Sequence, residues 1–86
     1  MDLADARLET FEAHLDTTFQ LGPHAFHLRQ VKALGAPAVA RAPFSLLFDG
    51  PEGLQQGIAA LEHPALGAVQ LFLVPIGPGR YEAVFT

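Results

Sequence analysis

The residues best suited to chemistry in this 86-residue sequence are an adjacent acid and imidazole, Glu62 and His63. A carboxylate beside an imidazole is typical of general acid–base catalysis, so this pair, with Arg80, defines one hypothesis: a small enzyme or ligand-binding barrel. Adjacent residues on a strand point to opposite faces, however, and two such side chains cannot act on one substrate atom. We therefore predict that His63, which directly precedes Pro64, binds the backbone of a turn.

Histidines also raise the question of metal binding. His24 and His27 are three residues apart, which places them on opposite faces of a strand, and no carboxylate lies near them in the sequence. A metal site needs three or four convergent ligands, and the sequence has no cysteine. We predict no metal site and no cofactor. The sequence leaves open whether these two histidines converge in space with His14 or His63.

Neither a nucleophile nor a phosphate-binding loop is indicated. Ser45 lies between two apolar residues without the G-x-S-x-G pattern that would expose it. Gly50, Gly53 and Gly57 punctuate one loop, but no Lys-Ser/Thr pair follows them. Residues 80–82, Arg-Tyr-Glu, are interpreted as a cross-strand pair plus a core tyrosine, with recognition of a partner's surface as the alternative. We predict no catalytic residues and a protein that is not an enzyme.

Composition limits the partners further. Apolar residues make up 50% of the sequence, which excludes disorder, and the net charge is −4. The basic residues are scattered singly, whereas a nucleic acid requires clustered cations, so we predict no nucleic acid partner. No apolar stretch approaches the length of a membrane span and no signal-peptide pattern opens the sequence. We expect a cytoplasmic protein without membrane contact.

The first sixteen residues carry the only pattern that predicts a helix. Asp2 or Asp5 is expected to cap its start, and residues 16–18 are expected to end it. Four apolar residues are spaced four, three and four apart along one narrow stripe: Ala4, Leu8, Phe11 and Leu15.

After the helix the pattern changes to short strands separated by Gly and Pro. Residues 34–43 are interpreted as a surface loop. Residues 63–67 and 76–80 are interpreted as hairpin turns, each with a glycine that supplies a positive φ. Because the late connections are too short for crossover helices, neighbouring strands should be antiparallel. The predicted strands are residues 17–21, 25–32, 44–49, 57–62, 69–76 and 81–85.

These elements predict an α+β, mostly β fold: a single domain of residues 1–86 with one N-terminal helix and a five- to six-stranded antiparallel sheet curled into a small barrel or sandwich. Alternation assigns three triplets to the core: Phe44, Leu46 and Phe48; Val69, Leu71 and Leu73; Tyr81, Ala83 and Phe85.

The opposite faces of the same strands are more apolar than a solvated surface requires. The helix is the first candidate to cover them, but its stripe spans only about two strands, so part of this surface should remain available as an interface. The candidate interface residues are Leu47, Phe72, Val74, Ile76 and Val84.

Three segments resemble a known family. They are PFSLLFDGP (residues 43–51), LEHPALGAVQLFLVPIGPGRYEAVF (residues 61–85) and TFEAHLDTTFQL (residues 10–21). Together they resemble small uncharacterised bacterial proteins described only as a domain of unknown function. The connection at residues 77–80 is shorter here than is common in that family. The resemblance implies a β-rich fold and genes that lie beside those of phage-tail-like collar proteins, and it implies no activity for any residue.

The leading hypothesis is therefore a non-enzymatic binding or assembly module, accessory to a phage-tail-like or other multimeric particle. Its partner would be a protein, with self-association into a homo-oligomer as the first expectation. The alternative is the small enzyme or ligand-binding barrel built around Glu62 and His63.

Overall fold

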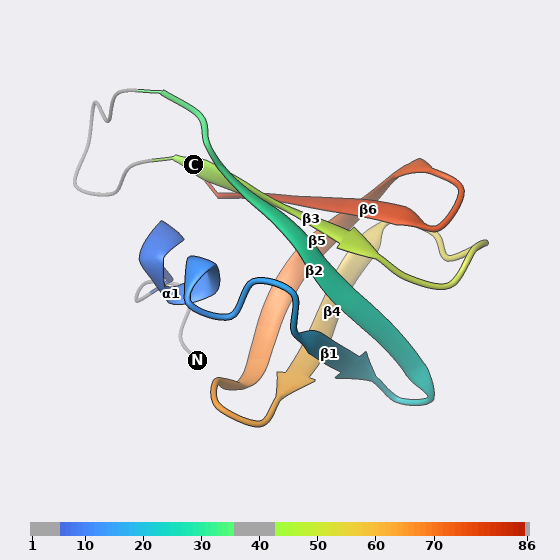
Figure 1. The fold of residues 1–86 in the computed structure, drawn as a ribbon. Helices are drawn as coiled ribbons and strands as arrows, with labels where there is room; N and C mark the ends of the chain where they lie inside the picture. Colours follow the sequence, from blue (N-terminus) through green and yellow to red (C-terminus); the bar gives the residue numbers. More distant parts are fainter. Residues whose placement is uncertain (1–5, 36–42, 86) are drawn as a thin grey trace.

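The described part of the chain, residues 6–35 and 43–85 of the computed structural model, forms a small antiparallel barrel (Figure 1). Its strands close in the order β1-β2-β3-β6-β5-β4, and every neighbouring pair is antiparallel. This confirms the predicted α+β, mostly β class and identifies the barrel as the arrangement adopted. The strands are β1 (Thr18–Leu21), β2 (His24–Ala33), β3 (Phe44–Asp49), β4 (Gly57–His63), β5 (Gly67–Gly77) and β6 (Arg80–Phe85).

All the predicted strands are present, with bounds that agree within two residues. The last three form a meander, joined by the two predicted hairpin turns. Gly67 at φ +73° and Gly79 at φ +70° supply the left-handed backbone that these turns require. Of the predicted loop at 34–43, residues 36–42 lie outside the described part of the chain.

Alternate residues of the strands fill the barrel. Aromatic rings pack edge to face across it: Phe19 and Phe48 have centroids 5.4 Å apart, and Phe26 and Tyr81 have centroids 5.5 Å apart. All three predicted core triplets are buried. Burying each large apolar side chain contributes about 1.5 to 3 kcal/mol, so these alternating positions are the main source of stability.

The helix is shorter than predicted. It covers only Leu8–Glu12 (α1), its N-cap is Arg7 in an extended conformation, and Leu15 is 40% exposed. Helix capping by Asp2 or Asp5 was therefore the wrong prediction; both residues, with Ala4, lie outside the described part of the chain. The sheet ends the helical segment early, because the Asp16 N–H donates to the Leu28 carbonyl and extends the pairing of β1 with β2.

The helix also lies in a different place from the one predicted. Phe11 is fully buried, with its ring 5.9 Å from that of Phe44 and 5.6 Å from that of Phe85. Phe44 and Phe85 are inward-facing core residues, so α1 packs at one end of the barrel (Figure 1). The prediction that the helix covers the outer faces of the strands was wrong, because its one large buried side chain joins the interior instead.

Candidate functional site

An apolar surface lies on the outside of β4, β5 and β6. Ile58 is 75% exposed, and it pairs directly with Phe72 across the β4–β5 ladder. Phe72, Ile76 and Val84 are each about half exposed. We call these four residues the outer apolar patch. Three of them belong to the predicted interface, and the structure leaves them uncovered by the described residues.

Two further predicted interface residues are less accessible. Leu47 and Val74 are half-buried, and both pair with Glu82, which lies between them in the sheet. Sequence reasoning missed Ile58, although the alternation of β4 contains the signal. Since Leu61 points inward, Ile58 three positions earlier must point outward.

Charged residues flank this surface. Arg80 is opposite Asp49 in the β3–β6 ladder, but the Asp49 carboxylate accepts a hydrogen bond from Arg29 Nε at 2.8 Å. The residue opposite Arg80 in the ladder is therefore paired with Arg29 of β2. Tyr81 is a core residue as predicted, and its hydroxyl donates to the Pro51 carbonyl.

The other candidate site is the β4–β5 hairpin. His63 is buried and Glu62 is exposed, so the two side chains point to opposite faces as predicted. The Ala65 N–H donates to His63 Nδ1 at 3.0 Å, which confirms that the imidazole binds turn backbone. On the other side of the ring, His63 Nε2 lies 3.0 Å from Thr17 Oγ1. The Thr17 hydroxyl in turn donates to the His14 carbonyl at 2.6 Å.

These contacts define the protonation state of His63. Because Nδ1 accepts a hydrogen bond, the proton of the neutral ring is on Nε2, which donates to Thr17. Burial lowers the pKa of His63 below its ordinary value of 6.5, and the neighbouring His14 ring, 4.8 Å away, lowers it further. His63 thus links the hairpin to the segment between α1 and β1 as a neutral group.

An open cavity of about 410 Å³ lies beside this hairpin, lined by Gln20, Glu62, His63, Pro64, Gly67 and Ala68. The Glu62 carboxylate is exposed at its edge. Both ring nitrogens of His63 are engaged by the protein itself. The imidazole therefore has no free nitrogen to move a proton to or from a molecule in this cavity.

The remaining histidines do not gather into a site. His27 Nε2 lies 3.3 Å from an Asp16 carboxylate oxygen at the surface, whereas His24 shares the inward alternation of Phe26. His14 approaches His63, which sequence reasoning left open. Within residues 6–35 and 43–85, no three His, Cys, Asp or Glu side chains are grouped as metal ligands.

Two other predicted features have structural roles. Ser45 is buried within β3, between Lys32 and Val84 in the ladders. A side chain at Gly50 would meet the Phe26 ring at 2.7 Å, so the ring occupies space that only glycine leaves open.

Among the described residues, no helix is both long and apolar enough to cross a membrane.

The fold and these surfaces define a small six-stranded antiparallel barrel with one short helix at an end and an apolar outer patch. The sequence profile of the family described as "Domain of unknown function (DUF6916)" matches residues 6–85, and the chain belongs to this family. The prediction that the chain resembles a family described as a domain of unknown function is thereby confirmed. No curated protein matches the chain. No solved structure matches it either.

Proposed function

We propose that this protein is a non-enzymatic assembly module that binds a second copy of its own chain through the outer apolar patch. The observation behind this proposal is the exposure of Ile58, Phe72, Ile76 and Val84 on three adjacent strands. Neighbouring exposed apolar side chains generally mark an interaction surface, because the exposure of apolar area to water is unfavourable in free energy. The core of the barrel is formed by other, inward-facing residues, so folding does not require these four to be apolar.

The charges around the patch favour a second copy as the partner. Arg80 and Glu82 both lie on the outer face of β6, and Glu62 is exposed on β4. In a two-fold symmetric pair the same surface meets itself, so Arg80 of one chain can face a glutamate of the other. The Arg29–Asp49 ion pair leaves Arg80 available for this contact. The apolar patch then forms the centre of the interface and the charges form its rim.

The state of His63 supports a role other than catalysis. General acid–base chemistry needs a titrating group within reach of substrate, and both nitrogens of this imidazole bind protein groups. The hairpin alternative, with Glu62 and His63 as a catalytic pair, is therefore the weaker proposal. A more specific version of this proposal is that the module is accessory to a phage-tail-like or other multimeric particle. This version rests on the sequence resemblance.

Sedimentation velocity over a hundredfold range of concentration tests self-association. We expect the wild type to sediment as a larger species at high concentration, and Phe72→Glu to stay monomeric because it places a charge at the centre of the patch. Leu34→Glu is the matched control. Leu34 is 43% exposed and directly follows β2, which is opposite β5 in the barrel order.

The control variant should associate like the wild type. A wild type that remains monomeric at every concentration would overturn the proposal. Equal loss of association in Phe72→Glu and Leu34→Glu would also overturn it, because the patch would then have no special part in binding.

A further inference from the structure

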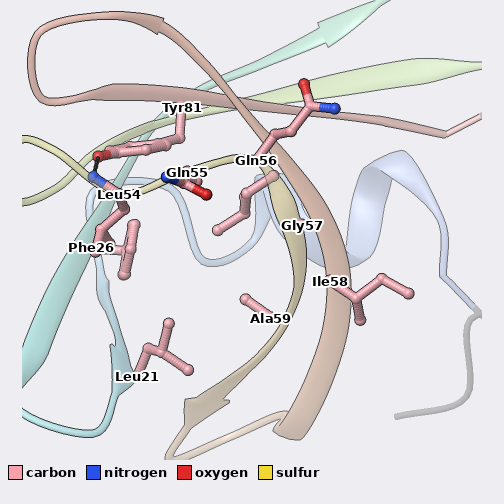
Figure 2. Close-up of a pocket in the computed structure, with 10 residues that line it drawn as sticks. Leu21, Phe26, Leu54, Gln55, Gln56, Gly57, Ile58, Ala59 and Tyr81 are labelled. Carbon is pink, nitrogen blue, oxygen red and sulfur yellow. Dashed lines mark hydrogen bonds between the residues drawn. The ribbon is translucent and has the colours of Figure 1, made fainter.

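A second cavity, of about 290 Å³, lies where β1 and β4 separate (Figure 2). The two strands meet at a single pair, Gln20 with Glu62, and β1 ends one residue later at Leu21. Along the rest of β4, no described strand pairs with it on the β1 side. Figure 2 shows Leu21 and Ala59 pointing toward each other across the opening, while Ile58 points away from it.

The cavity exists because β4 carries its smallest inward residues here. Inward positions elsewhere in the barrel are mostly Phe, Leu, Val or Tyr, but β4 begins with Gly57 and Ala59. A Cβ added at Gly57 would meet no heavy atom within 4 Å, so there is room at this position for a larger side chain. The sequence of β4 therefore leaves part of the barrel interior unfilled.

The walls of the cavity are held in place by contacts of their own. Phe26 and Leu73 are buried beneath it, and the Phe26 ring packs edge to face on Tyr81. The Tyr81 hydroxyl donates to the Pro51 carbonyl and accepts from the Leu54 N–H at 3.2 Å. This bridge fixes the β3–β4 connection, so Leu54 forms a wall. The cavity is therefore preformed, which lowers the cost of binding.

The lining indicates the chemistry of a ligand. None of the residues around the cavity is charged. Because the Tyr81 hydroxyl is already bound, the polar side chains left for a ligand are the amides of Gln55 and Gln56, both of which are exposed. Amides both donate and accept hydrogen bonds. A ligand would bury an apolar body against Leu21, Leu54 and Ala59, which are partly exposed, and keep one polar group at the rim.

The geometry points to a binding site for a small uncharged molecule with an aromatic or aliphatic ring and one hydrogen-bonding group. An apolar cavity of roughly 150 Å³ accepts benzene, and this one is larger, so it has room for a substituted ring. It is near the lower limit of about 300 Å³ for small-molecule sites, which excludes large cofactors. Ile58 borders the cavity and also belongs to the outer apolar patch, but its side chain points away from the opening (Figure 2), so either proposal can fail without the other.

Amide NMR titration of the ¹⁵N-labelled protein with 4-methylphenol tests the site, with 4-methylbenzoate as the charged counterpart. We expect saturable shift changes for 4-methylphenol at Leu21, Phe26 and residues 54–59, and affinity at least tenfold weaker for 4-methylbenzoate, because the cavity has no cation to pair with a carboxylate. The absence of saturable shifts up to the solubility limit of 4-methylphenol would overturn the inference. Saturation at other residues would overturn it too.

A matched pair of variants tests the location. Gly57→Val fills the cavity, whereas Gly77→Val adds the same side chain at a strand glycine that also has no neighbour within 4 Å. We expect at least tenfold weaker binding for Gly57→Val and unchanged binding for Gly77→Val. If Gly57→Val does not fold, Gly57→Ala provides a smaller filling, with a threefold loss expected. Unchanged affinity in the folded Gly57 variant would contradict the assignment.

Discussion

Strands β2 and β5 are opposite each other in the barrel, and they differ on one face only. Both direct apolar side chains inward, such as Leu28 on β2 and Leu71 on β5. On the outside, β2 presents polar side chains, including Arg29 and Lys32, and its Arg29 holds an ion pair with Asp49. The outside of β5 carries Phe72, Val74 and Ile76.

This difference shows which face of a strand must be apolar for the barrel to fold and which face need not be. An antiparallel barrel needs one apolar face on each strand, and β2 shows that a polar outer face is compatible with the same architecture. The apolar outer face of β5 therefore has another reason. We attribute it to the proposed contact with a second copy of the chain.

The largest expected effect compares an inward and an outward phenylalanine. Phe48→Ala should lower the free energy of unfolding by roughly 3 to 5 kcal/mol, because it removes a fully buried ring and leaves a cavity. Phe72→Ala should cost about 0.5 kcal/mol or less in the monomer, because Phe72 is 52% exposed. Chemical denaturation at low protein concentration measures both. Similar losses for the two variants would show that the outer face of β5 is buried within the monomer.

A smaller effect concerns pH and the hairpin that joins β4 to β5. The folded protein lowers the pKa of His63, so the unfolded chain binds a proton more readily than the folded one. Stability from this group is complete above about pH 6.5 and declines as the pH falls below it. Melting temperatures recorded from about pH 7.5 down to about pH 5 measure the decline.

His63→Gln should show a weaker pH dependence than the wild type over the same range. The matched control is His24→Gln, which removes a histidine of β2 that has none of the hairpin contacts. It should retain the wild-type decline. The account of the hairpin fails if His63→Gln and the wild type lose stability in parallel as the solution is acidified.

The polar face of β2 should contribute little to stability. Both members of the Arg29–Asp49 pair are more than a third exposed, with side-chain exposures of 56% and 37%. Solvent screens such pairs, so Arg29→Ala should cost no more than about 1 kcal/mol, and less at high salt. Denaturation at low and high salt checks this. A salt-independent loss above about 2 kcal/mol would mean that Arg29 does more than form a surface ion pair.

The smallest expected effect is the response to zinc. His24 and His27 lie on opposite faces of β2, and His63 is hydrogen-bonded to the backbone of its own hairpin. Zinc should therefore leave the melting temperature unchanged. Thermal denaturation across a zinc titration provides the measurement. A saturable rise that disappears in the double variant His24→Ala, His27→Ala would instead identify a metal site.

Sequence reasoning succeeded for the strands, because their side chains alternate between two faces at every second residue. Alternation along residues 44–49, 69–76 and 81–85 placed the core correctly, because a strand with one buried face cannot shift by one residue without exposing it. Proline and glycine marked the two hairpin turns, where only certain backbone conformations are allowed. These signals are local, and they are sufficient for strands and tight turns.

Long-range contacts could not be predicted in this way. The helix ended early because Asp16 joined the β1–β2 pairing, and Phe11 turned toward Phe44 and Phe85, which are distant in sequence. The approach of His14 to His63 and the gap between β1 and β4 likewise depend on barrel closure. No local sequence pattern predicts how a sheet closes into a barrel. These features of both candidate sites could therefore be seen only in the structure.

The most direct test of the proposed interface is a comparison of amide NMR spectra from dilute and concentrated samples of the wild-type protein. If the outer apolar patch binds a second copy, concentration-dependent shifts should gather at Ile58, Phe72 and Val84, while Arg29 and Lys32 on β2 remain unchanged. The spectrum of Phe72→Glu should not depend on concentration. Shifts that gather on β2 instead, or no change in the wild type at any concentration, would contradict the account.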